Sequence, residues 1–124
     1  MKLSIICFTL IFCSTADETK DLIEGALKSC GAQIDGPNNI GKLVLERNAD
    51  EAKLGATIFC ANKKINLQRT NGDINLDVLG NFLTTGNRDE ETAKKIMDCG
   101  RAKGDSGATK AFNFLKCHEM AIKT

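Results

Sequence analysis

Two cysteines enclose the most informative stretch of this sequence, residues 99–117, which reads CGRAKGDSGATKAFNFLKC. Its second half places Ala111, Phe112 and Leu115 three and four residues apart, which is the spacing of one helical face. Gly104 and Gly107 precede that face and predict a break between two helices. We therefore expect a helix ending before this break and a last helix over about residues 108–122.

The same helical spacing extends toward the N-terminus. Leu22, Ile23, Ala26, Leu27 and Cys30 share one face of a first helix, which Gly31 and the Gly36–Pro37 pair are expected to end. Further helices are predicted over about residues 39–46, from an N-cap at Asn48 or Asp50 to about 64, over 75–83, and from 88 onward. No window alternates as a strand does, so the expected fold class is all-α, a compact six-helix bundle.

One short motif resembles the start of a calcium loop. Asp73, Asn75 and Asp77 have the right spacing, but Val78 stands where the turn needs glycine and Thr84 where it needs a bidentate glutamate. The calcium site is therefore rejected. We expect Asp73 to cap the helix that follows it.

The N-terminus has the composition of a secretory signal peptide. Lys2 is followed by the apolar stretch Leu3–Cys13 and by small residues up to Ala16. Such a stretch is too short to anchor a chain in a bilayer, so cleavage after Ala16 is predicted. The expected domains are a signal peptide, 1–16, and a single secreted domain, 17–124.

Removing residues 1–16 takes away one of the 17 basic side chains and none of the 16 acidic ones. The remaining charge is balanced, which gives no electrostatic reason to expect nucleic acid or an anionic membrane as a partner. Cys30, Cys60, Cys99 and Cys117 remain, and in an oxidising compartment they predict two disulfides. Spacing alone leaves three pairings open.

These cysteines resemble those of the insect odorant-binding proteins. In that family six cysteines pair first with third, second with fifth and fourth with sixth, and Cys30, Cys60, Cys99 and Cys117 have the spacing of the first, third, fourth and sixth. The second and fifth would fall on Ala56 and Ala108, as in the four-cysteine "minus-C" subgroup. The resemblance covers essentially all of residues 17–124, and residues 71–77 also resemble the family's turn into its fourth helix.

The resemblance implies Cys30–Cys60 and Cys99–Cys117 bridges and a hydrophobic cavity among the helices. The absent middle bridge would make that cavity softer. The expected function is a non-enzymatic extracellular carrier of small hydrophobic molecules, odorant- or pheromone-like or otherwise lipophilic. No cofactor and no metal are expected. The expected cavity wall is Leu22, Leu54, Ile58, Leu76, Leu79, Phe82, Ile96, Phe112, Leu115 and Ile122.

Other partners and functions stay open at this point. A membrane receptor for ligand delivery would be a second partner, and the chain would be a monomer or a weak homodimer. A secreted cytokine- or hormone-like protein with a fully packed core is the main alternative. A secreted hydrolase is disfavoured because His118 is the only histidine and no nucleophile motif is present. A weaker hypothesis makes His118 a pH sensor near the cavity.

Overall fold

The computed structural model describes the backbone of residues 16–32, 37–85 and 89–123, and the side chains of residues 21–32, 40–84 and 89–122. Within these ranges the chain forms six helices and no strand, and one isolated bridge pairs Gln68 with Ile74. The helices are α2 (Ala16–Ser29), α3 (Pro37–Val44), α4 (Glu51–Lys64), α5 (Leu76–Thr85), α6 (Glu90–Cys99) and α7 (Gly107–Lys123). The all-α prediction is confirmed. The predicted signal peptide lies outside the described residues except for Ala16, where α2 begins.

Side chains fix several helix starts where the sequence predicts them. Asp50 accepts a hydrogen bond from the Lys53 N–H at 3.1 Å and caps α4. Asp89 does the same for α6 through the Thr92 N–H. A carboxylate at this position satisfies a donor that has no partner within the helix and lies at the positive end of the helix dipole.

The predicted cap of α5 is wrong. Val78 donates its N–H to Oδ1 of Asn75, at 3.3 Å, so Asn75 and not Asp73 caps the helix. The bridge between Gln68 and Ile74 holds the backbone extended up to residue 74, and the helix begins only after it. Asp73 instead bonds Nζ of Lys110 on α7 at 3.0 Å.

The predicted break between the last two helices is confirmed, because residues 100–106 separate α6 from α7. The helix ends at Cys99 and is capped by Gly100, before Gly104 and Gly107. A side chain at Gly100 would run into Leu76 and Leu79 of α5. Glycine at this position therefore lets the end of α6 approach α5 closely.

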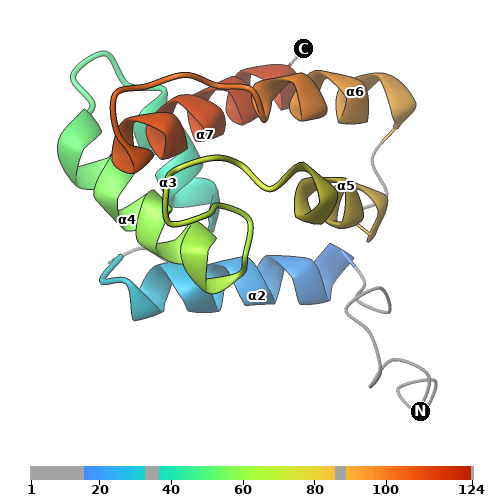
Figure 1. Cartoon of the computed structure of the whole chain (residues 1–124), viewed down its shortest axis with the longest axis horizontal. Coiled ribbons are helices and arrows are strands. Elements are labelled where there is room, and N and C mark those ends of the chain that lie inside the picture. Colours follow the sequence, from blue (N-terminus) through green and yellow to red (C-terminus); the bar gives the residue numbers. More distant parts are fainter. Residues whose placement is uncertain (1–15, 33–36, 86–88, 124) are drawn as a thin grey trace.

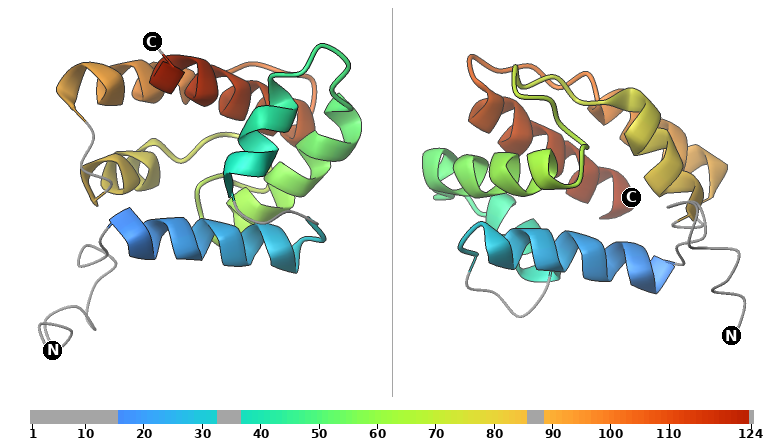
Figure 2. Two further views of the ribbon diagram at one scale, coloured as in Figure 1. Left: turned by 180° about the vertical axis from the view of Figure 1, so that it is seen from behind. Right: turned by 60° about the horizontal axis from the view of Figure 1, so that its bottom comes forward.

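The helices surround a common interior (Figures 1 and 2). In these views α2 lies on one side and α6 and α7 on the opposite side, with α3 and α4 at one end and α5 at the other. The chain reverses after α6, so that α7 runs back alongside it. The most extensive packing is between α4 and α7.

Glycines make that packing close. A Cβ at Gly55 of α4 would lie 3.0 Å from the carbonyl carbon and 3.4 Å from Cβ of Ala108 on α7. A Cβ at Gly107 would overlap the ring of Phe59 on α4. The two helices therefore touch nearly backbone to backbone at the level of Gly55 and Ala108.

Candidate ligand-binding site

Two disulfides tie the helices in pairs. Cys30, just after α2, bonds Cys60 of α4 with the Cα atoms 5.9 Å apart, and Cys99 of α6 bonds Cys117 of α7 with the Cα atoms 5.6 Å apart. Both bridges implied by the family resemblance are confirmed. By the chain-entropy model each contributes about 3–4 kcal/mol, so the bridges fix which helices lie against one another.

The interior that these helices enclose is aliphatic. Its members share low exposure and come from every described helix and from the segment between α4 and α5. The largest of them are Leu27, Ile40, Val44, Ile58, Ile65, Leu67, Ile74, Leu79, Leu83, Ile96, Phe112 and Phe114. The whole chain contains no tryptophan and no tyrosine. Such an interior offers apolar area and almost no hydroxyl donors, which suits aliphatic molecules.

The ten residues predicted to line a cavity fall into three groups. Ile58, Leu79, Ile96 and Phe112 are buried in the core. Leu54, Leu76, Phe82 and Leu115 are partly buried and pack against it. Leu22 and Ile122 are exposed, at 46% and 39% of their surface. The structure thus places eight of the ten in or against one interior, and it places two on the outside.

Sequence reasoning missed four members of this interior. Ile65, Leu67 and Ile74 follow α4 or precede α5, where no helical spacing marks them, and Phe114 lies on α7 beside the predicted face. The bridge between Gln68 and Ile74 turns the loop side chains inward. The available signal for burial was the presence of three large aliphatic residues, at positions 65, 67 and 74, on either side of a polar loop.

A separate hollow opens on the surface. It has a volume of about 530 Å³. The residues that line it come from the loop after α4, the first residue of α5, the segment after α6 and the start of α7. They are Arg69, Asp73, Ile74, Leu76, Gly100, Arg101, Ala102, Lys103, Gly104 and Lys110. We call this hollow the basic groove. Of the ten predicted wall residues only Leu76 borders it.

Charges within the basic groove are partly paired. The hydrogen bond from Lys110 and its positive charge hold the pKa of Asp73 below 3.8, so this carboxyl stays ionised at neutral pH. Arg101 lies 3.4 Å from Asp98, and both of these side chains are about 70% exposed. An exposed pair of this kind contributes little, which leaves Arg101 available to other anions.

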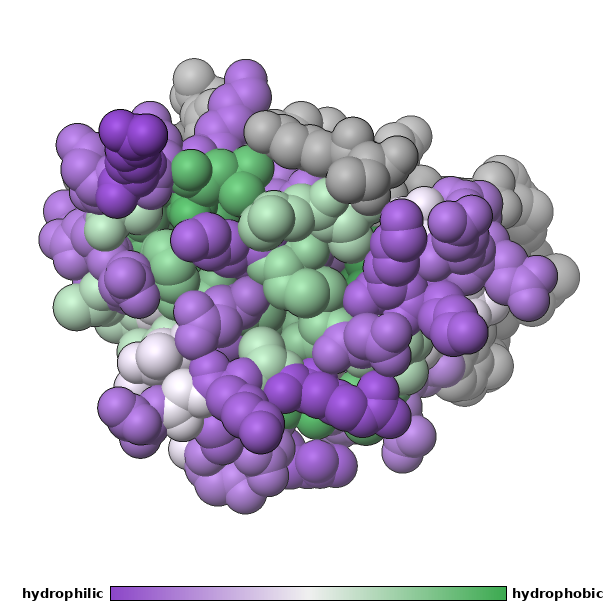
Figure 3. Space-filling model, turned by 90° about the horizontal axis from the view of Figure 1, so that it is seen from above, coloured by the Kyte–Doolittle hydropathy of each residue, from purple (hydrophilic) through white to green (hydrophobic). Residues whose placement is uncertain are grey.

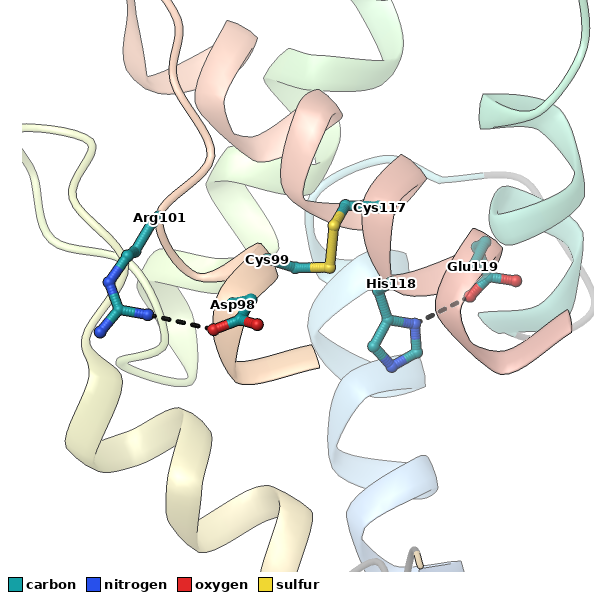
Figure 4. Close-up of a disulfide and its surroundings, with 6 residues drawn as sticks. All are labelled: Asp98, Cys99, Arg101, Cys117, His118 and Glu119. Atoms are coloured by element: carbon teal, nitrogen blue, oxygen red, sulfur yellow. Dashed lines mark hydrogen bonds and ion pairs between the residues drawn. A yellow bond between two sulfur atoms is a disulfide. The ribbon is translucent and has the colours of Figure 1, made fainter. Parts of the chain in front are cut away.

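His118 lies in a polar contact next to a disulfide (Figure 4). Its Nδ1 is 3.1 Å from Oε2 of Glu119, and its ring centroid is 6.3 Å from that of Phe114. The Glu119 carboxylate packs against Gly41 of α3. Within the described residues no group of three histidines, cysteines or acids could hold a metal ion. The pH-sensor hypothesis for His118 stays a prediction.

The surface over α6 and α7 shows apolar atoms in its middle with hydrophilic side chains around them (Figure 3). Met120, near the end of α7, is the most exposed large apolar residue among those described, at 55%. None of the described helices combines the length and the apolarity that crossing a bilayer requires.

Disulfides that link the elements of a small domain are typical of secreted proteins. The comparison with known families agrees: the PBP/GOBP family matches residues 14–121, which is nearly the whole chain. The chain therefore belongs to this family, the insect odorant-binding proteins. Members of the family are secreted proteins that bind small hydrophobic ligands. No curated protein and no solved structure matches the chain significantly.

Proposed function

We propose that this protein is an extracellular carrier that binds a small hydrophobic molecule among its helices. The observation that carries the proposal is the family match over residues 14–121, together with the mostly aliphatic interior to which all six described helices contribute. The family supplies the class of ligand. The side chains of this chain supply the selectivity, which favours flexible aliphatic molecules over polar ones.

The proposed site consists of the partly buried residues at the edge of the core. Leu54, Phe82 and Leu115 pack against buried residues and retain some exposed surface. Such residues can exchange contacts with water for contacts with a ligand without leaving the core. Affinity would come from apolar area, about 25 cal/mol per Å² before the entropy costs of binding, which corresponds to micromolar dissociation constants.

We further propose that residues 1–16 are a signal peptide and that the chain belongs to the four-cysteine subgroup. Cys7 and Cys13 would be removed with the signal peptide, and the other four cysteines are the ones that form the two bridges. The contact between Gly55 and Ala108 supports the alignment, because a bridge between positions 56 and 108 requires α4 and α7 to meet at this level.

A single introduced tryptophan tests the carrier function. Phe82→Trp places an indole at the edge of the core in a chain that has no other tryptophan. We expect a saturable change in its emission as an apolar ligand such as decanol is added, with a dissociation constant on the order of micromolar. The control, Met120→Trp, carries its indole on an exposed surface and should not respond.

The wild-type protein should also bind a fluorescent apolar probe saturably, and decanol should displace it. Absence of saturable probe binding by the folded protein would overturn the proposal and favour a fully packed signalling protein. An equal emission change in both tryptophan variants would place the ligand outside the interior.

A further inference from the structure

The basic groove concentrates charge that the rest of the chain does not have. The whole chain has a net charge of +1, whereas the groove brings together four basic side chains, Arg69, Arg101, Lys103 and Lys110, and one acidic one, Asp73. These residues lie far apart in the sequence. They meet because the loop after α4 and the segment after α6 both pack near the start of α7.

Asp73 forms an ion pair with one of these four basic side chains. Its carboxylate is bonded to Lys110, at 3.0 Å, so these two charges cancel each other. Arg101 and Lys103 stand on the other wall of the groove, on the segment that follows α6. Among the described residues, the ion pair on this segment is the exposed contact of Arg101 with Asp98. The lining residues alone carry four basic side chains and one acidic one, and the exposed pair with Asp98 is too weak to keep Arg101 from binding another anion.

A smaller part of the groove's lining is apolar. Ile74 is 7% exposed, and Leu76 packs against the core. Ala102 completes the apolar lining between the two basic residues 101 and 103. The volume of about 530 Å³ falls in the range that holds small molecules. The groove thus combines basic side chains with a smaller apolar part of its lining.

We propose that the basic groove is a second binding site, outside the helical interior, for a small molecule with an anionic head and a short apolar body. Arg101 and Lys103 hold the head, and Ile74 and Leu76 contact the body. The site differs from the carrier site in its residues and in its requirement for charge. It does not depend on the carrier function.

Octanoate and octanol provide a matched pair of probes, because they share a chain length and differ in the charged head. Amide chemical shifts of the ¹⁵N-labelled protein would be followed at neutral pH and low ionic strength. We expect octanoate to shift the amides of residues 69–76 and 100–104 saturably. Octanol and inorganic phosphate should each bind the groove at least about fivefold more weakly, since each lacks one of the two contacts.

The double variant Arg101→Gln/Lys103→Gln should weaken octanoate binding at the groove about fivefold. Both side chains are exposed, so the fold should be retained. The matched control Lys53→Gln/Lys94→Gln removes two exposed charges outside the groove and should leave the affinity unchanged. Added salt should weaken the binding of octanoate and not that of octanol.

The proposal is overturned if octanoate does not shift the groove amides, if octanol or phosphate binds there as tightly, or if the two double variants behave alike. Binding of apolar probe in the interior is measured in parallel. Retention of that binding in Arg101→Gln/Lys103→Gln, together with loss of octanoate binding, would establish two separate sites.

Discussion

The side-chain amide of Asn62 donates a hydrogen bond of 2.9 Å to Oε1 of Gln68, and both side chains are buried. Gln68 then donates through Nε2 to the carbonyl oxygens of Gly72, at 2.7 Å, and Gly107, at 3.0 Å. One side chain thereby joins the end of α4, the loop that follows it and the first residue of α7. This loop forms one wall of the basic groove, so the network holds that wall in place.

Replacing Gln68 should therefore lower the free energy of unfolding. Gln68→Leu keeps the size of the side chain but leaves the Asn62 amide and two carbonyl groups without this partner. We expect a loss of about 2–4 kcal/mol in the free energy of unfolding, measured by denaturant titration. Thr70→Val, an exposed change in the same loop, should stay within about 0.5 kcal/mol of wild type. Equal stability of both variants would show that the network contributes nothing.

Replacing a helical glycine by alanine should change the stability in opposite directions at Gly55 and Gly25. Gly55→Ala pushes a methyl group into the backbone of Ala108 and should destabilise the protein by about 1–3 kcal/mol. Gly25→Ala adds a methyl group on α2 where no other atom lies within 4 Å, and should stabilise it by about 0.5–1 kcal/mol. Thermal and denaturant unfolding of the two variants measures both. A stabilising Gly55→Ala would contradict the close contact of α4 with α7.

A third disulfide should form where the family alignment places it. Ala56→Cys/Ala108→Cys introduces cysteines beside the contact of α4 with α7. We expect the oxidised variant to be six hydrogens lighter than its fully reduced form, against four for the two native bridges alone. The new bridge should raise the stability by up to about 4 kcal/mol. If the absence of this bridge softens the interior, the oxidised variant should bind a narrower range of apolar ligands. Free thiols at both positions after oxidation would show that the alignment is wrong.

Asp89 should make stability depend on pH in acid. Hydrogen bonds from the Thr92 side chain and from its N–H lower the pKa of Asp89 below 3.8. Because the folded-state pKa lies below the unfolded one, the stabilising contribution is present above about pH 4 and is lost as the pH falls through the folded value. Asp89→Asn can keep the cap without the charge.

The difference in unfolding free energy between wild type and Asp89→Asn should thus be constant near neutral pH and shrink below about pH 4. A series of denaturant titrations between pH 7 and the acid limit measures this difference. A difference that does not change with pH would rule out titration of Asp89 as its source.

Local patterns in the sequence predicted the six helices. The spacing of Leu22, Ile23 and Ala26 indicates α2, and Asp50 caps α4 as expected. The pairing of the cysteines, by contrast, followed from a family resemblance, since spacing left three possibilities. The cap of α5 was wrongly assigned to Asp73, because a contact between Gln68 and Ile74, which no local pattern reveals, keeps the backbone extended up to residue 74.

The candidate sites were predictable to different degrees. Apolar residues at helical spacing identify Ile58, Leu79 and Ile96 as inward-facing, although spacing cannot separate a core residue from a ligand contact. The basic groove could not be predicted from the sequence. Arg69 and Arg101 are separated by more than a whole helix, and only the packing of two loops against α7 brings them to one hollow.

The order of the two disulfides along the chain determines which cleaved fragments stay covalently linked. The disulfide loops 30–60 and 99–117 do not overlap, so the segment 61–98 is the covalent connection between them. Proteolytic cleavage within that segment yields two fragments that separate on denaturation without any reductant. Cleavage inside either disulfide loop leaves the fragments linked. Mass spectrometry of partially digested protein under non-reducing conditions therefore shows which region unfolded locally and was cleaved first.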